Sequence, residues 1–171
     1  MWLIKIFSVI FVLVFIIACS EQNTLNEKAI NENQIKNLII KHKQAWEEGG
    51  YKLLDSILHE DVVFAYPGRR LNKQETLKDL VDYNNTFKDT EIYINKIIID
   101  GNDLAVEWQF ASTNKKTGIR TAVSDAIIGK VKDGKIIVWK EYLDGRVSRM
   151  QVNGTLSLDE GEESFPWPKK K

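Results

Sequence analysis

The stretch DGKIIVWKEYLD, residues 133–144, decides how the rest of the chain is interpreted. It opens with Asp133-Gly134, a dipeptide favoured in two-residue hairpin turns because both positions tolerate a positive φ angle. The residues that follow alternate along an extended strand, whose one face carries Ile137, Trp139, Glu141 and Leu143. The sequence therefore predicts a hairpin whose second strand, Lys135 to Asp144, closes an antiparallel sheet.

Three more strands are predicted before this hairpin, because apolar and polar residues alternate there with a period of two. They run from Glu91 to Ile99, from Asp103 to Ser112 and from Gly118 to Lys132. One face of the second strand presents Trp108 among apolar residues, and one face of the third presents Asp125 in the same way. Consecutive strands joined by short turns indicate an antiparallel meander.

The part of the chain before the meander has a helical period instead. Apolar residues recur at spacings of three and four from Gln34 until Gly49-Gly50 ends the run, and His42 and Trp46 fall on this apolar face. A short second helix is expected from Tyr51 to Leu58.

A strand and a third helix complete this N-terminal part. Val62 to Tyr66 has the composition of a strand, which Pro67-Gly68 ends. Asn72 and Glu75 have the spacing of a capping box and predict a helix that runs to about Asn85. This order of elements predicts an α+β fold, in which three N-terminal helices pack on one face of a curved, mainly antiparallel sheet.

One domain is expected between residues 34 and 151, because a chain of 171 residues with 43% hydrophobic composition can supply one core. Residues 20–33 are polar and lack a hydrophobic period, which predicts a flexible tether. Residues 152–171 form an acidic tail that ends in Phe165-Pro166-Trp167-Pro168 and three lysines.

The first eighteen residues have the features of a secretion signal. Lys5 is followed by an apolar run from Ile6 to Ile17 that only Ser8 interrupts. A run of about twelve residues is too short for a membrane-spanning helix, which needs roughly twenty.

The end of this segment, Ile16-Ile17-Ala18-Cys19, resembles the bacterial lipobox. The resemblance implies that Cys19 receives a lipid, becomes the new N-terminus and anchors residues 19–33 and the domain to a membrane of the cell envelope. A plain signal peptide or an uncleaved anchor with an incidental cysteine is the alternative. Cys19 is the chain's one cysteine, so a disulfide within one molecule is excluded.

Charge and motifs exclude several classes of partner. The chain has 24 basic and 24 acidic residues, and removal of the signal with its Lys5 leaves a net charge near −1. This balance gives no indication of nucleic-acid binding. The two histidines, seventeen residues apart, lack a metal-ligand spacing, and no cofactor fingerprint is present, so we expect neither a metal nor a cofactor.

The order of elements, the Asp133-Gly134-Lys135 hairpin with its Trp139-x-Glu141-Tyr142-x-Asp144 strand, and the Asp61…Tyr66-Pro67-Gly68 segment resemble the SnoaL-like branch of the nuclear-transport-factor-2-like (NTF2-like) superfamily. The resemblance covers about Gln34 to Gln151. It implies a cone-shaped fold with a deep pocket between sheet and helices. It does not imply one activity, because members include isomerases, hydrolases, cyclases, dehydratases and scaffolds.

Two carboxylates are the leading candidates for chemistry in such a pocket. Alternation places Asp125 and Glu141 on the concave face of the sheet. Burying a carboxylate is costly unless it is paired or protonated, so two of them suggest one neutral donor and one base. The alternative is that they pair with Arg120, Arg146 or a backbone amide near the rim.

Comparison with two families extends this list. Against the ketosteroid isomerases, His42 falls at the place of a pocket tyrosine and Tyr66 at the place of the catalytic aspartate, which argues against steroid-type isomerisation. His42 is a candidate general acid or base, with a satisfied core histidine as the alternative. Against limonene-epoxide hydrolases, Trp139 and Glu141 keep the spacing of a Trp-x-Asp motif, but the partner Arg-x-Asp falls near the apolar segment around Trp108.

We therefore expect a membrane-anchored domain that binds a small apolar organic molecule. The candidate catalytic residues are Glu141, Asp125 and His42, and the candidate ligand-binding residues are Tyr66, Trp108, Trp139 and Trp46. The alternative function is an interaction or dimerisation module that uses the outer face of the sheet and retains a vestigial pocket.

Overall fold

A computed structural model describes residues 31–158 of the chain. The predictions for the signal, for Cys19 and for the tail with Phe165-Pro166-Trp167-Pro168 lie outside the described residues. Among the helices of the described part, none is long and apolar enough to cross a membrane.

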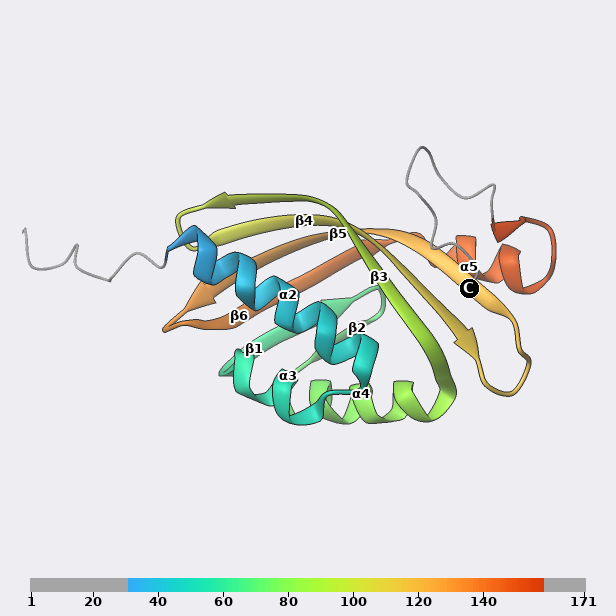
Figure 1. The fold of residues 1–171 in the computed structure, drawn as a ribbon, viewed down its shortest axis with the longest axis horizontal. Helices are drawn as coiled ribbons and strands as arrows, with labels where there is room; N and C mark the ends of the chain where they lie inside the picture. The colour runs from blue at the N-terminus through green and yellow to red at the C-terminus, as the bar shows by residue number, and fades with distance from the viewer. Residues whose placement is uncertain (1–30, 159–171) are drawn as a thin grey trace, which may run out of the picture.

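A curved sheet of six strands forms the frame of the domain (Figure 1). Its spatial order is β2-β1-β6-β5-β4-β3. The strands are β1 (Leu58–Tyr66), β2 (Arg69–Leu71), β3 (Phe87–Asp100), β4 (Asp103–Asn114), β5 (Arg120–Lys132) and β6 (Lys135–Leu143). Neighbours are antiparallel except β1 and β6, which run parallel, so the predicted mainly antiparallel sheet is confirmed.

Three helices lie on one side of this sheet, as the sequence predicts: α2 (Glu32–Glu48), α3 (Tyr51–Ile57) and α4 (Lys73–Thr86) (Figure 1). Asn31 caps α2, which begins two residues before the predicted start. Gly49 ends α2 in the left-handed conformation with φ of 70°. The predicted capping box of Asn72 and Glu75 is present at the start of α4.

The hairpin that decides the fold contains an irregularity that alternation does not predict. Asp133 and Gly134 adopt positive φ angles, as a type I′ turn requires. The register between β5 and β6 then shifts, so that Val131 pairs with Ile136 and Lys130 with Val138. Ile137 is the extra residue of this bulge, so the alternation of side chains between the two faces reverses there. Ile136, rather than the predicted Ile137, is fully buried at this end of the inner face.

A fourth helix, α5 (Gly145–Val152), follows β6 and is missing from the sequence prediction. The paired part of β5 ends at Asp125, opposite Leu143, so the edge of β5 before that residue has no strand partner. The side chain of Gln151 accepts a hydrogen bond from the Ala122 amide there, at 2.9 Å. The helix thus covers a strand edge that would otherwise expose unpaired backbone groups.

Candidate functional site

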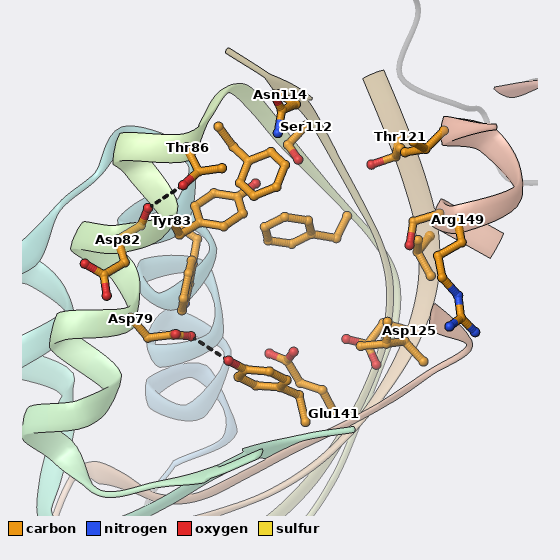
Figure 2. A pocket seen from close by; sticks show the side chains of 18 of the residues that line it. Asp79, Asp82, Tyr83, Thr86, Ser112, Asn114, Thr121, Asp125, Glu141 and Arg149 are labelled. Carbon is orange, nitrogen blue, oxygen red and sulfur yellow. Dashed lines mark hydrogen bonds between the residues drawn. The ribbon is translucent and has the colours of Figure 1, made fainter. Parts of the chain in front are cut away.

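A cavity of about 750 Å³ lies between the concave face of the sheet and the helices (Figure 2). Most of its wall is apolar. The aromatic residues of the wall are Trp46, Phe64, Tyr66, Tyr83, Phe87, Trp108 and Phe110. A largely apolar cavity of this size with a few polar groups is typical of sites for small organic molecules.

Asp125 and Glu141 both line this cavity (Figure 2). Asp125 comes from β5 and Glu141 from the neighbouring strand β6. Trp108 lies opposite Asp125 on β4, and Glu141 lies opposite Ile127 on β5. The alternation of side chains along the strands predicted that these two carboxylates lie on the same face of the sheet, and in the structure both line the cavity.

Asp125 is buried, with 6% of its surface exposed, and both of its oxygens accept hydrogen bonds. The indole N–H of Trp108 donates to Oδ2 at 3.2 Å, and the amide of Tyr142 donates to Oδ1 at 3.0 Å. Burial raises the pKa of Asp125 to about 6, although both hydrogen bonds oppose the rise. The raised pKa makes the carboxylate of Asp125 a stronger base than an exposed aspartate.

Glu141 is the second carboxyl group of the pair. Its Oε1 accepts a hydrogen bond from the Trp139 indole N–H at 2.9 Å. Desolvation, with a smaller contribution from the charge of Asp125, raises the pKa of Glu141 to about 8. Because the pKa values of both groups are raised, the pair tends to keep a proton near neutral pH, so it can both donate and accept one.

The proposed arginine partners of these carboxylates are engaged elsewhere. Arg120 pairs with Glu91 at 3.1 Å, and Arg146 pairs with Asp144. The alternative in which Arg120 or Arg146 neutralises the pair therefore does not describe this structure. The backbone-amide alternative holds for Asp125, through the amide of Tyr142.

A third acidic residue of the cavity was missed by sequence reasoning. Asp79 lines the wall from α4, and Tyr66 donates a hydrogen bond from its hydroxyl to Asp79 Oδ2 at 3.0 Å. Burial, with Asp79 as a further cause, raises the pKa of Tyr66 to about 12, so the phenol remains a donor. The helical spacing of four residues from Asp79 to Tyr83, which also lines the cavity, is the sequence signal that could have revealed it.

His42 does not line the cavity. It has no exposed surface, and its ring stacks on Trp139 with 4.1 Å between ring centroids. The indole of Trp46 donates to Nε2 at 3.3 Å, so the proton of the neutral ring resides on Nδ1, which has no hydrogen-bond partner among the described residues. Burial lowers the pKa of His42 to about 3. His42 therefore has no access to a ligand in the cavity. It is a core residue rather than the predicted general acid or base.

The predicted ligand-binding residues also divide into those that line the cavity and one that lies in the core. Trp46, Tyr66 and Trp108 line the cavity. Trp139 is fully buried behind the wall and contributes through its hydrogen bond to Glu141. Trp108 and Trp139 therefore each donate a hydrogen bond to one carboxyl group of the pair. Of these two tryptophans, Trp108 lines the cavity and Trp139 does not.

The described residues contain no group of three or more His, Cys, Asp or Glu side chains that could hold a metal ion. The polar side chains in the described lining carry carboxyl, phenol, hydroxyl and amide groups, with the guanidinium of Arg149.

A curved sheet closed by helices around an aromatic cavity defines the NTF2-like cone. The family within this fold is also clear: the chain belongs to the SnoaL-like domain family, whose model matches residues 40–139. Asp125 lies inside the matched region, and Glu141 lies two residues beyond its end.

Solved structures share this fold. An LEH-like epoxide hydrolase from M. tuberculosis has a TM-score of 0.64 at 20% identity and covers 74% of this chain and 91% of its own. IdmH from Streptomyces antibioticus, a proposed polyketide cyclase, has a TM-score of 0.62 at 17% identity, with 69% and 97% covered. A proposed polyketide cyclase from Acidithiobacillus ferrooxidans has a TM-score of 0.64 at 18% identity, with 72% and 96% covered. At these identities the likeness establishes the fold alone. No curated protein matches this chain.

Proposed function

We propose that this domain binds a small, mostly apolar organic molecule in its cone, and that Glu141 and Asp125 act on it as an acid–base pair. The observation that carries the proposal is an open aromatic cavity with two carboxyl groups on neighbouring strands, both of whose pKa values burial raises. The two kinds of neighbour named above, an epoxide hydrolase and a proposed polyketide cyclase, support a small organic substrate.

In such a reaction one proton is given to the substrate and one is taken from it or from water, and the pair can do both. Protonated Glu141 gives its proton to an oxygen on which negative charge develops, while ionised Asp125 takes one from carbon or from water. An isomerisation, elimination or hydrolysis each requires one donor and one acceptor in this arrangement. Exchange with water returns the pair to its starting state.

The alternative is a non-catalytic module that pairs through the outer face of the sheet, giving a homodimer. Large apolar side chains are exposed on that face, namely Tyr93, Ile98, Ile128 and Tyr142. A collapsed cavity would favour this alternative, whereas the cavity here is open and carries the two carboxylates. Binding in the cone is therefore the better-supported function, and pairing through the sheet is compatible with it.

The proposal predicts that filling the cavity removes a bound ligand. Val123 on β5 lines the cavity, so Val123→Trp should occupy the space that a ligand needs. Ile128, five residues further on the same strand, is 50% exposed on the opposite face, so Ile128→Trp is the matched control. The full chain is purified from its native host, and denaturing solvent extraction with mass spectrometry measures the released molecule.

We expect wild type and Ile128→Trp to release the same organic molecule, and Val123→Trp to release at least about tenfold less. Equal release from all three proteins would place the molecule outside the cone and contradict the proposal.

Membrane attachment through Cys19 is a separate part of the proposed function. It is supported by the apolar run before Ile16-Ile17-Ala18-Cys19, and it would locate the domain on the outer side of a bacterial membrane. Two or more acyl chains suffice for stable anchoring. The chain would then contact the membrane through the lipid attached to Cys19.

Replacement of Cys19 by alanine is expected to abolish lipid incorporation, because the thiol is the acyl acceptor. Cells are labelled with radioactive palmitate, and the immunoprecipitated protein is analysed on a gel; Ser20→Ala is the neighbouring control. Label in the Cys19→Ala protein at the wild-type level would refute the lipobox interpretation.

A further inference from the structure

The charges of the cavity do not balance. Four acidic side chains line it, Asp79, Asp82, Asp125 and Glu141 (Figure 2), and Arg149 on α5 is the one basic side chain in the described lining. Arg149 is exposed, and its charge acts on Asp144. Electrostatically, the cavity is therefore an acidic one with aromatic walls.

Two of the four acidic groups have compensation from nearby residues. Asp79 accepts a hydrogen bond from Tyr66 and has the guanidinium of Arg69 at 4.0 Å. Asp82 pairs with Lys78 on the solvent side of α4. These two carboxylates do not require a ligand to balance them.

Asp125 and Glu141 have no such compensation. Within residues 31–158, no nitrogen of Lys, Arg or His lies within 4.0 Å of either carboxyl group, although twelve ion pairs of that length occur elsewhere. Their partners are neutral donors, the indoles of Trp108 and Trp139 and the amide of Tyr142. Asp125 is buried and Glu141 is half-buried, so this acidic pair without a cation is costly, and a positively charged ligand would reduce that cost.

The wall around the pair suits such a ligand. The face of an aromatic ring attracts a cation, most strongly for tryptophan. Tyr83 meets Trp46 edge to face at 5.5 Å and Phe110 at 5.6 Å between ring centroids, so these three rings form an aromatic corner. Trp108 continues this wall to the carboxylate of Asp125.

We infer that the cone selects an organic cation, a protonated amine with an apolar body, over a neutral molecule of the same shape. This inference rests on the proposed function, because it names the class of molecule that the same cavity binds. The ammonium group lies between Asp125 and Glu141, and the apolar body lies against Trp46, Tyr83 and Phe110. The ammonium group meets the negative charge of the carboxyl pair, which grows as the pH rises, so affinity rises with pH.

A pair of probes tests this directly. 2-Naphthylmethylamine is protonated between pH 5.5 and 8, and 2-naphthylmethanol has the same rings with a neutral hydroxyl group. Each is titrated into the full chain, and NMR follows the indole N–H signals of Trp108 and Trp139, which contact the two carboxylates. The variants are Glu141→Gln and Asp125→Asn, and Glu107→Gln on the exposed outer face of β4 is the matched control.

We expect the ammonium to bind at least about tenfold tighter than the alcohol at pH 8, and this preference to fall several-fold at pH 5.5, as protonation removes negative charge. Glu141→Gln and Asp125→Asn should each reduce the preference, while Glu107→Gln should retain it. Equal or tighter binding of the alcohol at pH 8 would overturn the cation inference and leave the proposed function intact. Binding of neither probe would overturn both.

Discussion

The His42→Gln variant is expected to lose most of the acid sensitivity of the native domain. In the unfolded chain a histidine protonates near pH 6.5, whereas burial lowers the pKa of folded His42 to about 3. Between these values the unfolded state binds the additional proton, so the free energy of unfolding decreases as the pH falls. Each pKa unit corresponds to about 1.4 kcal/mol, which gives a loss on the order of 5 kcal/mol by pH 3.

Urea titrations at several pH values between 7 and 3.5 measure this effect. Glutamine retains an acceptor for the Trp46 indole but cannot titrate in this range. It also loses the stacking on Trp139, so the variant should be less stable than wild type at pH 7, and the informative quantity is the slope. His59→Gln removes the other histidine, which lies at the partly exposed start of β1, and should keep the wild-type slope. Parallel slopes for wild type and His42→Gln would contradict a buried neutral His42.

This expectation also explains why a pocket role for His42 could not be decided from the sequence. The apolar face of α2 covers both the cavity and the core beneath it, and helical periodicity cannot separate the two. Trp46, one turn further along, reaches the cavity wall, whereas His42 lies under Trp139. The difference depends on how α2 crosses the sheet, which is a tertiary property.

The strands carried more information, because each has one buried face. Alternation was sufficient to place Asp125 and Glu141 together on the concave surface, and the structure has both in the cavity wall. It failed at Ile137, because a bulge after the Asp133-Gly134 turn adds a residue that no local pattern reveals.

The elements missed from the sequence are short ones. β2 has three residues, Arg69–Leu71, too few to show alternation. α5 has eight residues and begins with glycine, although Asp144 accepts a hydrogen bond from the Arg146 amide and is a readable N-cap. Asp79 was missed because an acidic residue on an amphipathic helix is usually solvent-facing, whereas this one lines the cavity and accepts the hydrogen bond of Tyr66.

The Glu141→Gln variant is expected to show the opposite pH effect from His42→Gln. Desolvation and the charge of Asp125 raise the pKa of folded Glu141 from 4.5 to about 8. Between these values the folded state keeps a proton that the unfolded chain has lost, so the free energy of unfolding of the wild type decreases as the pH rises. The loss should be roughly 2–4 kcal/mol between pH 4.5 and 8, less than the full shift implies, because an open cavity admits water.

Glutamine keeps the shape of Glu141 and an oxygen for the Trp139 indole, but it carries no titrating proton. The variant should therefore gain stability relative to wild type as the pH rises from 4.5 to 8, while Glu107→Gln should not. Asp125 and Glu141 titrate as a pair, so urea midpoints over this range report the pair rather than one residue. Wild-type and Glu141→Gln curves that stay parallel from pH 4.5 to 8 would mean that Glu141 ionises as in water. The cavity would then contain two anions at neutral pH, and the acid–base division would be lost.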